Sequence, residues 1–256
     1  MAFPELKNKI VLVIGGAQGI GKEVCRMFAL EQATVIDADY QYDGTLQSVD
    51  QTHFQAFVDV REESSVIELV EQLQRADLVP DILVHVAGIS TMDFLLESQT
   101  EDFDQVLAVN RRGAYLACTY VVRAMKQRKK AGRVIIVASQ AGKNAYRGMS
   151  PYVASKHAVL GLTKNLALEV AKDQILVNAV CPGIIETEMK WRERAEGALL
   201  RGMTPEEVLA EDQSQVPLGR TGQPKDVGNV VLFLASDLSS YVTGQAINIT
   251  GGMTMN

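Results

Sequence analysis

The 256-residue sequence has only three cysteines, Cys25, Cys118 and Cys181, which lie far apart and form no CxxC pair. An odd number at such spacing argues against a disulfide framework and against a zinc site, and is typical of a reducing compartment. Each cysteine is therefore expected to be a small buried hydrophobic side chain.

The sequence also lacks long apolar runs and extended blocks of one charge. No apolar stretch approaches the length of a membrane span, and the N-terminal residues do not read as a cleavable signal. The net charge is −6, and the short basic run KQRKK at 126–130 suits the C-terminal end of a helix. These absences favour a cytoplasmic protein with neither a membrane nor a nucleic-acid partner.

Short β-branched runs alternate with helical patterns along the chain. The runs lie at 9–16, 33–39, 53–60, 81–88, 132–139, 175–183 and 245–252. The first six contain consecutive apolar residues, so their strands are predicted to be buried on both faces. Strand–helix alternation predicts an α/β fold: one domain, 1–256, with a doubly wound parallel sheet of about seven strands and helices on both faces.

Two segments carry more specific expectations. Residues 100–125 are long enough for about six helical turns, with Thr100 as the expected N-cap. The stretch from 40 to 58 is short, so an abbreviated helix at 44–50 or an irregular loop is expected there. In a parallel sheet, ligands bind beyond the C-terminal ends of the strands. The strand ends are therefore where chemistry is sought.

The first strand end carries Gly15, Gly19 and Gly21, spaced G-x-x-x-G-x-G ahead of a helix. Glycine permits positive φ and a close approach of the backbone to a pyrophosphate, and the helix N-terminus offers free N–H groups. A strand–helix turn that merely needs small residues is the alternative. The position directly after the first β-branched run favours dinucleotide binding.

The second strand end carries Asp37 and Asp39, and Asp39 lies 18 residues past Gly21. A carboxylate there accepts hydrogen bonds from the adenosine ribose of NAD and repels the 2′-phosphate of NADP. Gln18 leaves the glycine turn without a basic residue for that phosphate. The prediction is NAD (NADH), held by Asp39 in preference to Asp37.

Further polar residues follow the later strands, and their order completes a pattern. Ser139 ends the fifth run, and Tyr152 and Lys156 share one face of a predicted helix at i, i+4. The full set is the glycine turn, DV at 59–60, AG at 87–88, Asn110, Ser139, Tyr152, Lys156, PG at 182–183 and Thr187. In this order and spacing the sequence resembles the short-chain dehydrogenase/reductase family over essentially its whole length, which implies a Rossmann-like fold.

The resemblance implies catalytic roles for four residues. Tyr152 is expected to be the general acid/base, and the Lys156 ammonium to lower its pKa and hold the nicotinamide ribose. Ser139 is expected to hydrogen-bond the substrate oxygen. Asn110 resembles the family's helix residue that supports a water and proton relay to the lysine.

The resemblance also implies a set of cofactor contacts. Asp59 is expected to accept from the adenine amino group beside Val60, and Thr187 to contact the nicotinamide carboxamide or the diphosphate. The complete expected set is Gly15, Gln18, Gly19, Ile20, Gly21, Asp39, Asp59, Val60, Ala87, Gly88, Tyr152, Lys156, Pro182, Gly183, Ile185 and Thr187. No metal is expected.

The sequence departs from the family pattern at two positions. Ile14 stands where the family usually has threonine before the glycine turn, and His85 begins the segment that is usually NNAG. His85 is not expected to be catalytic, and His53 and His157 are expected to be structural or exposed.

Two regions are expected to line a substrate pocket. One runs from Ser139 to Tyr152, and the other, 187–215, resembles the family's mobile lid, with a pair of plain surface helices as the alternative. The substrate candidates are Gln140, Lys143, Asn144, Arg147, Met149 and Trp191. The polar residues among 140–147 suit a polyhydroxylated, phosphorylated or carboxylated substrate, or else form a solvated loop.

The expected activity is NAD-dependent interconversion of a secondary alcohol and a ketone, with a polyol or sugar-type small molecule as substrate. The C-terminal segment is similar to sugar-alcohol dehydrogenases, whereas other motifs are similar to 3-oxoacyl-carrier-protein reductases and 2,3-dihydro-2,3-dihydroxybenzoate dehydrogenases. An inactive nucleotide-binding scaffold is the non-enzymatic alternative. The family usually forms homotetramers, for which Tyr115, Tyr120, Leu160, Leu166 and Val242 are candidate contacts, or else core residues.

Overall fold

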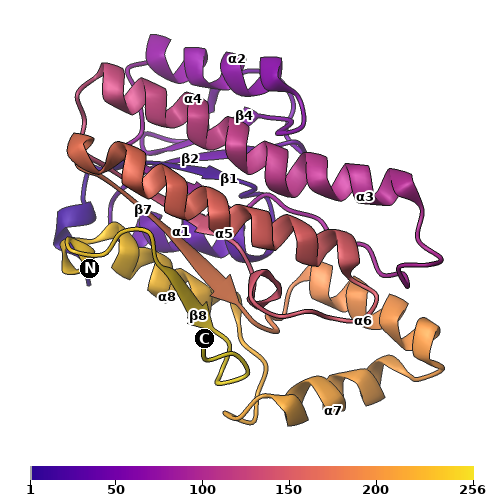
Figure 1. Ribbon diagram of the computed structural model, residues 1–256. Coiled ribbons are helices and arrows are strands. Elements are labelled where there is room, and N and C mark those ends of the chain that lie inside the picture. The colour runs from indigo at the N-terminus through magenta and orange to yellow at the C-terminus, as the bar shows by residue number, and fades with distance from the viewer. Residues whose placement is uncertain (1) are drawn as a thin grey trace.

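A computed structural model describes residues 2–256 of the chain (Figure 1). The strands are β1 (Ile10–Ile14), β2 (Thr34–Asp39), β3 (Gln47–Ser48), β4 (His53–Phe57), β5 (Ile82–His85), β6 (Gly132–Val137), β7 (Ile175–Pro182) and β8 (Ala246–Ile249). Each of the seven predicted runs contains one of these strands. The sequence pattern therefore located the strands correctly, with β3 as an addition.

The α-helices are α1 (Gly19–Leu30), α2 (Glu63–Arg75), α3 (Thr100–Leu107), α4 (Gly113–Gln127), α5 (Ser150–Val170), α6 (Glu188–Arg201), α7 (Pro205–Gln215) and α8 (Pro224–Ala235). Short 3₁₀ turns are η1 (Pro4–Leu6), η3 (Gln140–Gly142), η4 (Ala171–Asp173) and η5 (Asp237–Ser239), and η2 (Ala108–Arg112) is a π-helical turn. Within residues 2–256, no helix combines the length and apolarity needed to cross a bilayer.

The strands form one sheet in the order β3-β4-β2-β1-β5-β6-β7-β8. Every neighbouring pair is parallel except β3 with β4, which is antiparallel. The chain moves outward from β1 in one direction and then from β5 in the other. The two strands that flank this reversal, β1 and β5, define the position where α/β sheets bind ligands.

The segment before β4 is expected to be a short helix or an irregular loop, but it forms a small hairpin in which β3 pairs with β4. The backbone N–H groups of Thr52 and His53 donate to Asp50 Oδ1 at 2.7 and 2.8 Å. This turn folds Gln47–Ser48 back against β4. An aspartate that accepts from the backbone two residues ahead is a turn former, and here it prevails over the weak helical pattern of 44–50.

Two hydrophobic cores lie on opposite faces of the sheet. The first packs α2, α4 and α5 against the sheet, and the second packs α1 and α8 against its other face (Figure 1). Strands β1, β2 and β5 to β7 are almost wholly buried, as their apolar runs predicted. Strand β4 is only partly buried, because its outer neighbour is the two-residue β3. The prediction of two buried faces is wrong for this strand.

The long helix predicted for 100–125 is interrupted by the π turn η2, which separates α3 from α4. Thr100 is the first residue of α3 and not its N-cap. The extended residue that precedes the helix is Gln99, and no side chain caps the first turn. The cysteines are as predicted, since all three are free and buried.

A test of this packing is a truncation in the central strand. Leu12→Ala removes a fully buried side chain of β1, and should lower the free energy of unfolding by about 2–5 kcal/mol. The matched change Leu30→Ala, at a leucine that is 61% exposed, should cost about 0.5 kcal/mol or less. Urea denaturation of both variants measures the difference, and equal midpoints would contradict the described core.

Candidate active site

The C-terminal ends of the parallel strands open into one cavity of about 640 Å³. Its wall contains most of the predicted cofactor residues and three of the four predicted catalytic residues. Those present are Gly15, Gln18, Gly19, Ile20, Asp39, Asp59, Val60, Ala87, Gly88, Ser139, Tyr152, Lys156, Pro182, Gly183, Ile185 and Thr187. Gly21 and Asn110 lie behind this wall. One cavity therefore connects the glycine turn to the tyrosine–lysine pair.

The glycine turn is packed so tightly that side chains are excluded from it. A Cβ on Gly15, whose φ is +91°, would lie 2.5 Å from the Ala87 nitrogen at the end of β5. A Cβ on Gly21 would lie 1.9 Å from the Gly15 carbonyl oxygen. Gly19 and Ile20 of the first turn of α1 line the cavity, and no side chain caps the N–H groups of that turn. This is the arrangement that binds a diphosphate.

The two aspartates of β2 have different surroundings. Asp39 lines the cavity and accepts from the backbone N–H groups of Ala17 and Gln41 at 3.1 and 3.0 Å. Asp37 lies beneath Gly16, accepts from the Tyr42 hydroxyl at 2.6 Å, and has a raised pKa because of burial. Of the two, only Asp39 is placed to meet a ligand in the cavity.

Asp59 and Val60 line the same end of the cavity, beside Arg61. The Arg61 guanidinium forms hydrogen bonds to both carboxylate oxygens of Asp59, at 2.6 to 3.1 Å. These bonds lower the pKa of Asp59. The carboxylate is thereby already engaged, and its expected contact with adenine stays a prediction.

Tyr152 and Lys156 lie on the first turns of α5, with the Lys156 ammonium 5.5 Å from the centre of the tyrosine ring. Lys156 is buried and donates to the Val137 carbonyl at 2.9 Å. Burial lowers the pKa of Lys156 to about 8. The i, i+4 spacing therefore brings a phenol and a desolvated ammonium together at the cavity wall.

The expected lowering of the Tyr152 pKa is not found in the protein alone. Removal of the phenol from water raises its pKa, the Glu193 carboxylate raises it further, and Ser139 opposes both by hydrogen bonding. Desolvation thus outweighs the attraction of the phenolate for Lys156. Without further positive charge in the cavity, the phenol stays protonated at neutral pH.

Asn110 belongs to the π turn η2, and its side chain links three segments. Its Oδ1 accepts from the Ile89 N–H at 2.8 Å, and its Nδ2 donates to the Ile89 carbonyl and to Ser155 Oγ, both at 2.9 Å. A Cβ on Gly88 would lie 3.3 Å from Asn110 Oδ1 and 3.5 Å from Lys156 Nζ. Asn110 therefore fixes the end of β5 beside the lysine.

His85 is fully enclosed at the end of β5. Among the described residues neither of its ring nitrogens has a hydrogen-bond partner. Burial, with the nearby charge of Lys156, lowers its pKa to about 3. The ring is therefore neutral at physiological pH. His85 is not among the residues that line the cavity, which agrees with the expectation that it is not catalytic.

The predicted substrate residues divide into two groups. Gln140 and Met149 line the cavity. Lys143 donates to the carbonyls of Ala246 and Asn256, Asn144 donates to Thr254, and Arg147 stacks over Phe94. The structure does not bring these three, or Trp191, to the cavity wall. Lys143 and Asn144 thus bind the C-terminal segment of the chain. The sequence analysis did not predict this structural role.

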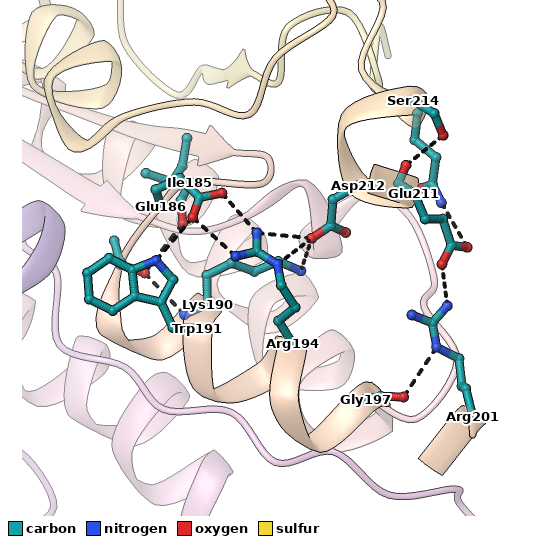
Figure 2. A network of polar contacts seen from close by, with 12 residues as sticks. Ile185, Glu186, Lys190, Trp191, Arg194, Gly197, Arg201, Glu211, Asp212 and Ser214 are labelled. Atoms are coloured by element: carbon teal, nitrogen blue, oxygen red, sulfur yellow. Dashed lines mark hydrogen bonds and ion pairs between the residues drawn. The ribbon is translucent and has the colours of Figure 1, made fainter. Parts of the chain in front are cut away.

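The segment 187–215 forms α6 and α7, which lie beyond the end of β7 (Figure 1). Figure 2 shows Arg194 of α6 between Glu186, which precedes the segment, and Asp212 of α7. Its Nη2 lies 2.8 Å from Glu186 Oε1 and 3.2 Å from Asp212 Oδ2. Lys190 adds a contact of 3.3 Å to Asp212. This buried network holds both helices over the cavity.

The cavity side of α6 carries charged residues that the sequence did not single out. Glu193 accepts from Ser90 Oγ at 2.5 Å, and Arg192 donates to the Ser90 carbonyl at 2.8 Å and to Ser90 Oγ at 3.0 Å. Lys190, Arg192 and Glu193 all line the cavity. No motif marks them, and only their position a few residues after Thr187 could have drawn attention to them.

Within residues 2–256, histidine, cysteine and acidic side chains do not gather in threes as a metal site would need. The polar groups of the cavity are instead single donors and acceptors spaced along its wall. This spacing suits an elongated organic ligand.

Comparison with known proteins gives matches over the whole chain. A family model described as enoyl-(acyl carrier protein) reductase matches residues 15–254. The 3-oxoacyl-[acyl-carrier-protein] reductase FabG of Thermotoga maritima is 38% identical over 257 residues, which covers 98% of this chain and 99% of that protein.

Solved structures agree with this match. Sorbitol-6-phosphate 2-dehydrogenase from Erwinia amylovora has a TM-score of 0.91 at 32% identity, covering 96% of this chain and 100% of that one. An actinorhodin polyketide ketoreductase with NADPH has a TM-score of 0.89 at 31% identity, covering 99% of each chain. A 4-hydroxyisoleucine dehydrogenase with NADH has a TM-score of 0.83 at 29% identity, covering 96% and 99%.

The Arg194 network gives a test of how α6 and α7 are held. Arg194→Leu leaves the partly buried Glu186 without its cation and the buried Asp212 with Lys190 alone, and breaking a buried pair in this way typically costs about 3–5 kcal/mol. Amides of α6 and α7 should then exchange with solvent on the order of 100-fold faster, measured by hydrogen–deuterium exchange. The matched control is Arg201→Leu in the exposed pair with Glu211, worth about 1 kcal/mol or less. Equal protection in both variants would contradict the assigned role of Arg194.

Proposed function

The chain belongs to the short-chain dehydrogenase/reductase family and is an oxidoreductase of secondary alcohols and ketones, and we propose that it is an NAD-dependent enzyme acting on a polyol or sugar-type substrate. The observation that carries the proposal is the meeting of Tyr152, Lys156 and Ser139 with the glycine turn in one cavity. An inactive scaffold would have no need to keep that set intact.

The cavity fits a nicotinamide dinucleotide. The glycine turn, where a Cβ at Gly15 or Gly21 would clash, would hold the diphosphate. Asp39 and Val60 would flank the adenosine. Pro182, Gly183, Ile185 and Thr187 line the opposite side, where the nicotinamide would lie. When bound, that cofactor supplies or accepts the hydride. The protein supplies position and proton transfer.

The proton chemistry falls to Tyr152. Its phenol donates a proton to the substrate oxygen in ketone reduction and accepts one in alcohol oxidation. Ser139 binds the same oxygen as its charge changes. The buried Lys156 ammonium favours the phenolate, and Asn110 keeps the end of β5 in register with it. Because burial raises the Tyr152 pKa, oxidation should be faster at alkaline pH.

Preference for NAD is supported by Asp39. Its carboxylate lies at the cavity wall beside Ala17 and would face the adenosine ribose. A fixed negative charge there disfavours the 2′-phosphate of NADP, and Gln18 supplies no cation to offset it. Related structures hold NADH in one case and NADPH in another, so the preference rests on this residue.

The polyol assignment is supported by polar side chains of the cavity near Tyr152, including Gln140 and Glu193. Similarity to a sorbitol-6-phosphate 2-dehydrogenase points the same way. The second candidate is reduction of a 3-oxoacyl thioester, which the similarity to a 3-oxoacyl-[acyl-carrier-protein] reductase favours. The acceptor and donor groups of Gln140 and Glu193 in this mostly apolar cavity are the reason to prefer the polyol.

We further propose a cytoplasmic homotetramer. Tyr115 is 55% exposed on α4 and is available for a subunit contact. Leu160 is buried in the core, and Tyr120, Leu166 and Val242 pack partly against the cores, so these four are weaker candidates. Light scattering of the purified chain tests the assembly.

The proposed chemistry is tested by Tyr152→Phe. Loss of the hydroxyl should reduce kcat for oxidation of a secondary alcohol by about 10²–10⁴-fold, since acid–base catalysis contributes that much. Binding of NADH, measured by fluorescence titration, should persist. The control Tyr241→Phe changes a fully exposed phenol outside the cavity and should keep full turnover. Retained turnover in Tyr152→Phe would refute the mechanism.

The cofactor assignment is tested by Asp39→Asn. Neutralising the carboxylate should raise kcat/KM for NADP relative to NAD by about tenfold or more, equivalent to about 1.4 kcal/mol. The control is Asp43→Asn, an exposed aspartate four residues further on. Wild-type preference for NADP would contradict the assignment before any variant is made.

A further inference from the structure

Glu193 occupies an unusual position in the cavity wall. It is on α6, lines the same cavity as Tyr152, and accepts one short hydrogen bond from Ser90 Oγ at 2.5 Å. Within residues 2–256 its second oxygen, Oε2, has no donor or cation as partner. A carboxylate in a partly desolvated site with a free oxygen has strong acceptor capacity left over.

The surrounding residues hold this carboxylate toward the cavity. Ser90 is only 3% exposed and is itself held by two hydrogen bonds from Arg192. On the other side of α6, Arg194 ties the helix to Glu186 and Asp212 (Figure 2). The Arg194 contacts therefore fix the position of α6, and the Ser90 hydrogen bond fixes the Glu193 carboxylate at the cavity wall.

The charge of Glu193 reaches the reacting group. Glu193 and Tyr152 line the same cavity, and Ser90, which holds Glu193, directly follows Ile89, which Asn110 links to Ser155 on the helix of Tyr152. In keeping with this placement, the Glu193 carboxylate contributes to the raised pKa of Tyr152. A substrate whose carbinol carbon lies at Tyr152 would thus bring its neighbouring groups toward Glu193. An apolar neighbour would leave the carboxylate unpaired, and a hydroxyl would pair with it.

We propose that Glu193 is a specificity-determining residue, whose free oxygen accepts a hydrogen bond from a second hydroxyl next to the reacting carbinol. The assignment rests on the proposed function, and narrows the substrate to neutral vicinal diols and polyols. A site that hydrogen-bonds a substrate hydroxyl strongly rejects the analogue that lacks it. A 3-oxoacyl thioester has no hydroxyl to offer at that position.

The experiment compares two substrates that differ by one hydroxyl, 2,3-butanediol and 2-butanol, with NAD at alkaline pH. The readout is the ratio of their kcat/KM values, because a general loss of activity cancels in it. The variants are Glu193→Gln, which keeps the shape and removes the charge, and Glu193→Leu, which removes the acceptor. The matched control is Glu206→Gln, an exposed glutamate of α7 outside the cavity wall.

Wild-type enzyme should prefer the diol, and Glu193→Leu should reduce that preference by about 100-fold, the effect of one hydrogen bond to a charged group. Glu193→Gln should reduce it by about tenfold, because a neutral acceptor forms the weaker bond. Glu206→Gln should leave the ratio unchanged.

Oxidation of both alcohols with the same ratio in all four proteins would overturn the role of Glu193 alone. Failure of the wild type to oxidise either alcohol or a hexitol with NAD would overturn the proposed function. If the wild type oxidises none of these alcohols and Glu193→Leu reduces a 3-oxoacyl thioester efficiently, the site does not require the Glu193 carboxylate. That result would overturn the role of Glu193 together with the proposed function.

Discussion

The structure depends on the close approach of two backbone segments, the turn after β1 and the end of β5. The Ile14 carbonyl accepts from both Val86 and Ala87, and Gly15 leaves no room for a side chain between them. This contact lies between β1 and β5, where the strand order reverses. At such a position the connecting helices go to opposite faces of the sheet and leave a crevice beyond the strand ends. The glycine turn, the end of β5 and the tyrosine–lysine pair face one another because of it.

The parts of this arrangement that could be predicted are those that local sequence determines. Consecutive β-branched residues located seven strands, and glycine spacing located the turn after β1. Spacing favoured Asp39 over Asp37 as the cofactor contact, and Asp39 does line the cavity, whereas Asp37 lies beneath Gly16 and binds Tyr42. The contact of Asp39 with the cofactor stays a prediction. Local pattern failed at 44–50, where the turn chemistry of Asp50 outweighed helical periodicity.

The remaining features depend on contacts between distant residues. Lys143 was expected at a substrate, but backbone carbonyls more than 100 positions away bind its ammonium. The Tyr152 pKa was expected to fall because of Lys156, but the loss of solvent around the phenol is the larger effect. Likewise, the partners of Arg194 and Glu193 come from separate elements. Desolvation and pairing of this kind have no signature in a short stretch of sequence.

The π turn η2 restricts which insertions and deletions the segment 108–112 can accept. A π turn is a helical turn with one residue more than its neighbours require. Deleting one residue from 108–112 would restore a continuous α-helix and leave α3 and α4 in nearly the same relative rotation, because five residues of a π turn sweep about the same angle as four of an α-helix. What would be lost is the widened turn that places the Asn110 side chain against Ile89 and Ser155. Insertions and deletions here should therefore be selected against more strongly than substitutions of the exposed Arg111 and Arg112.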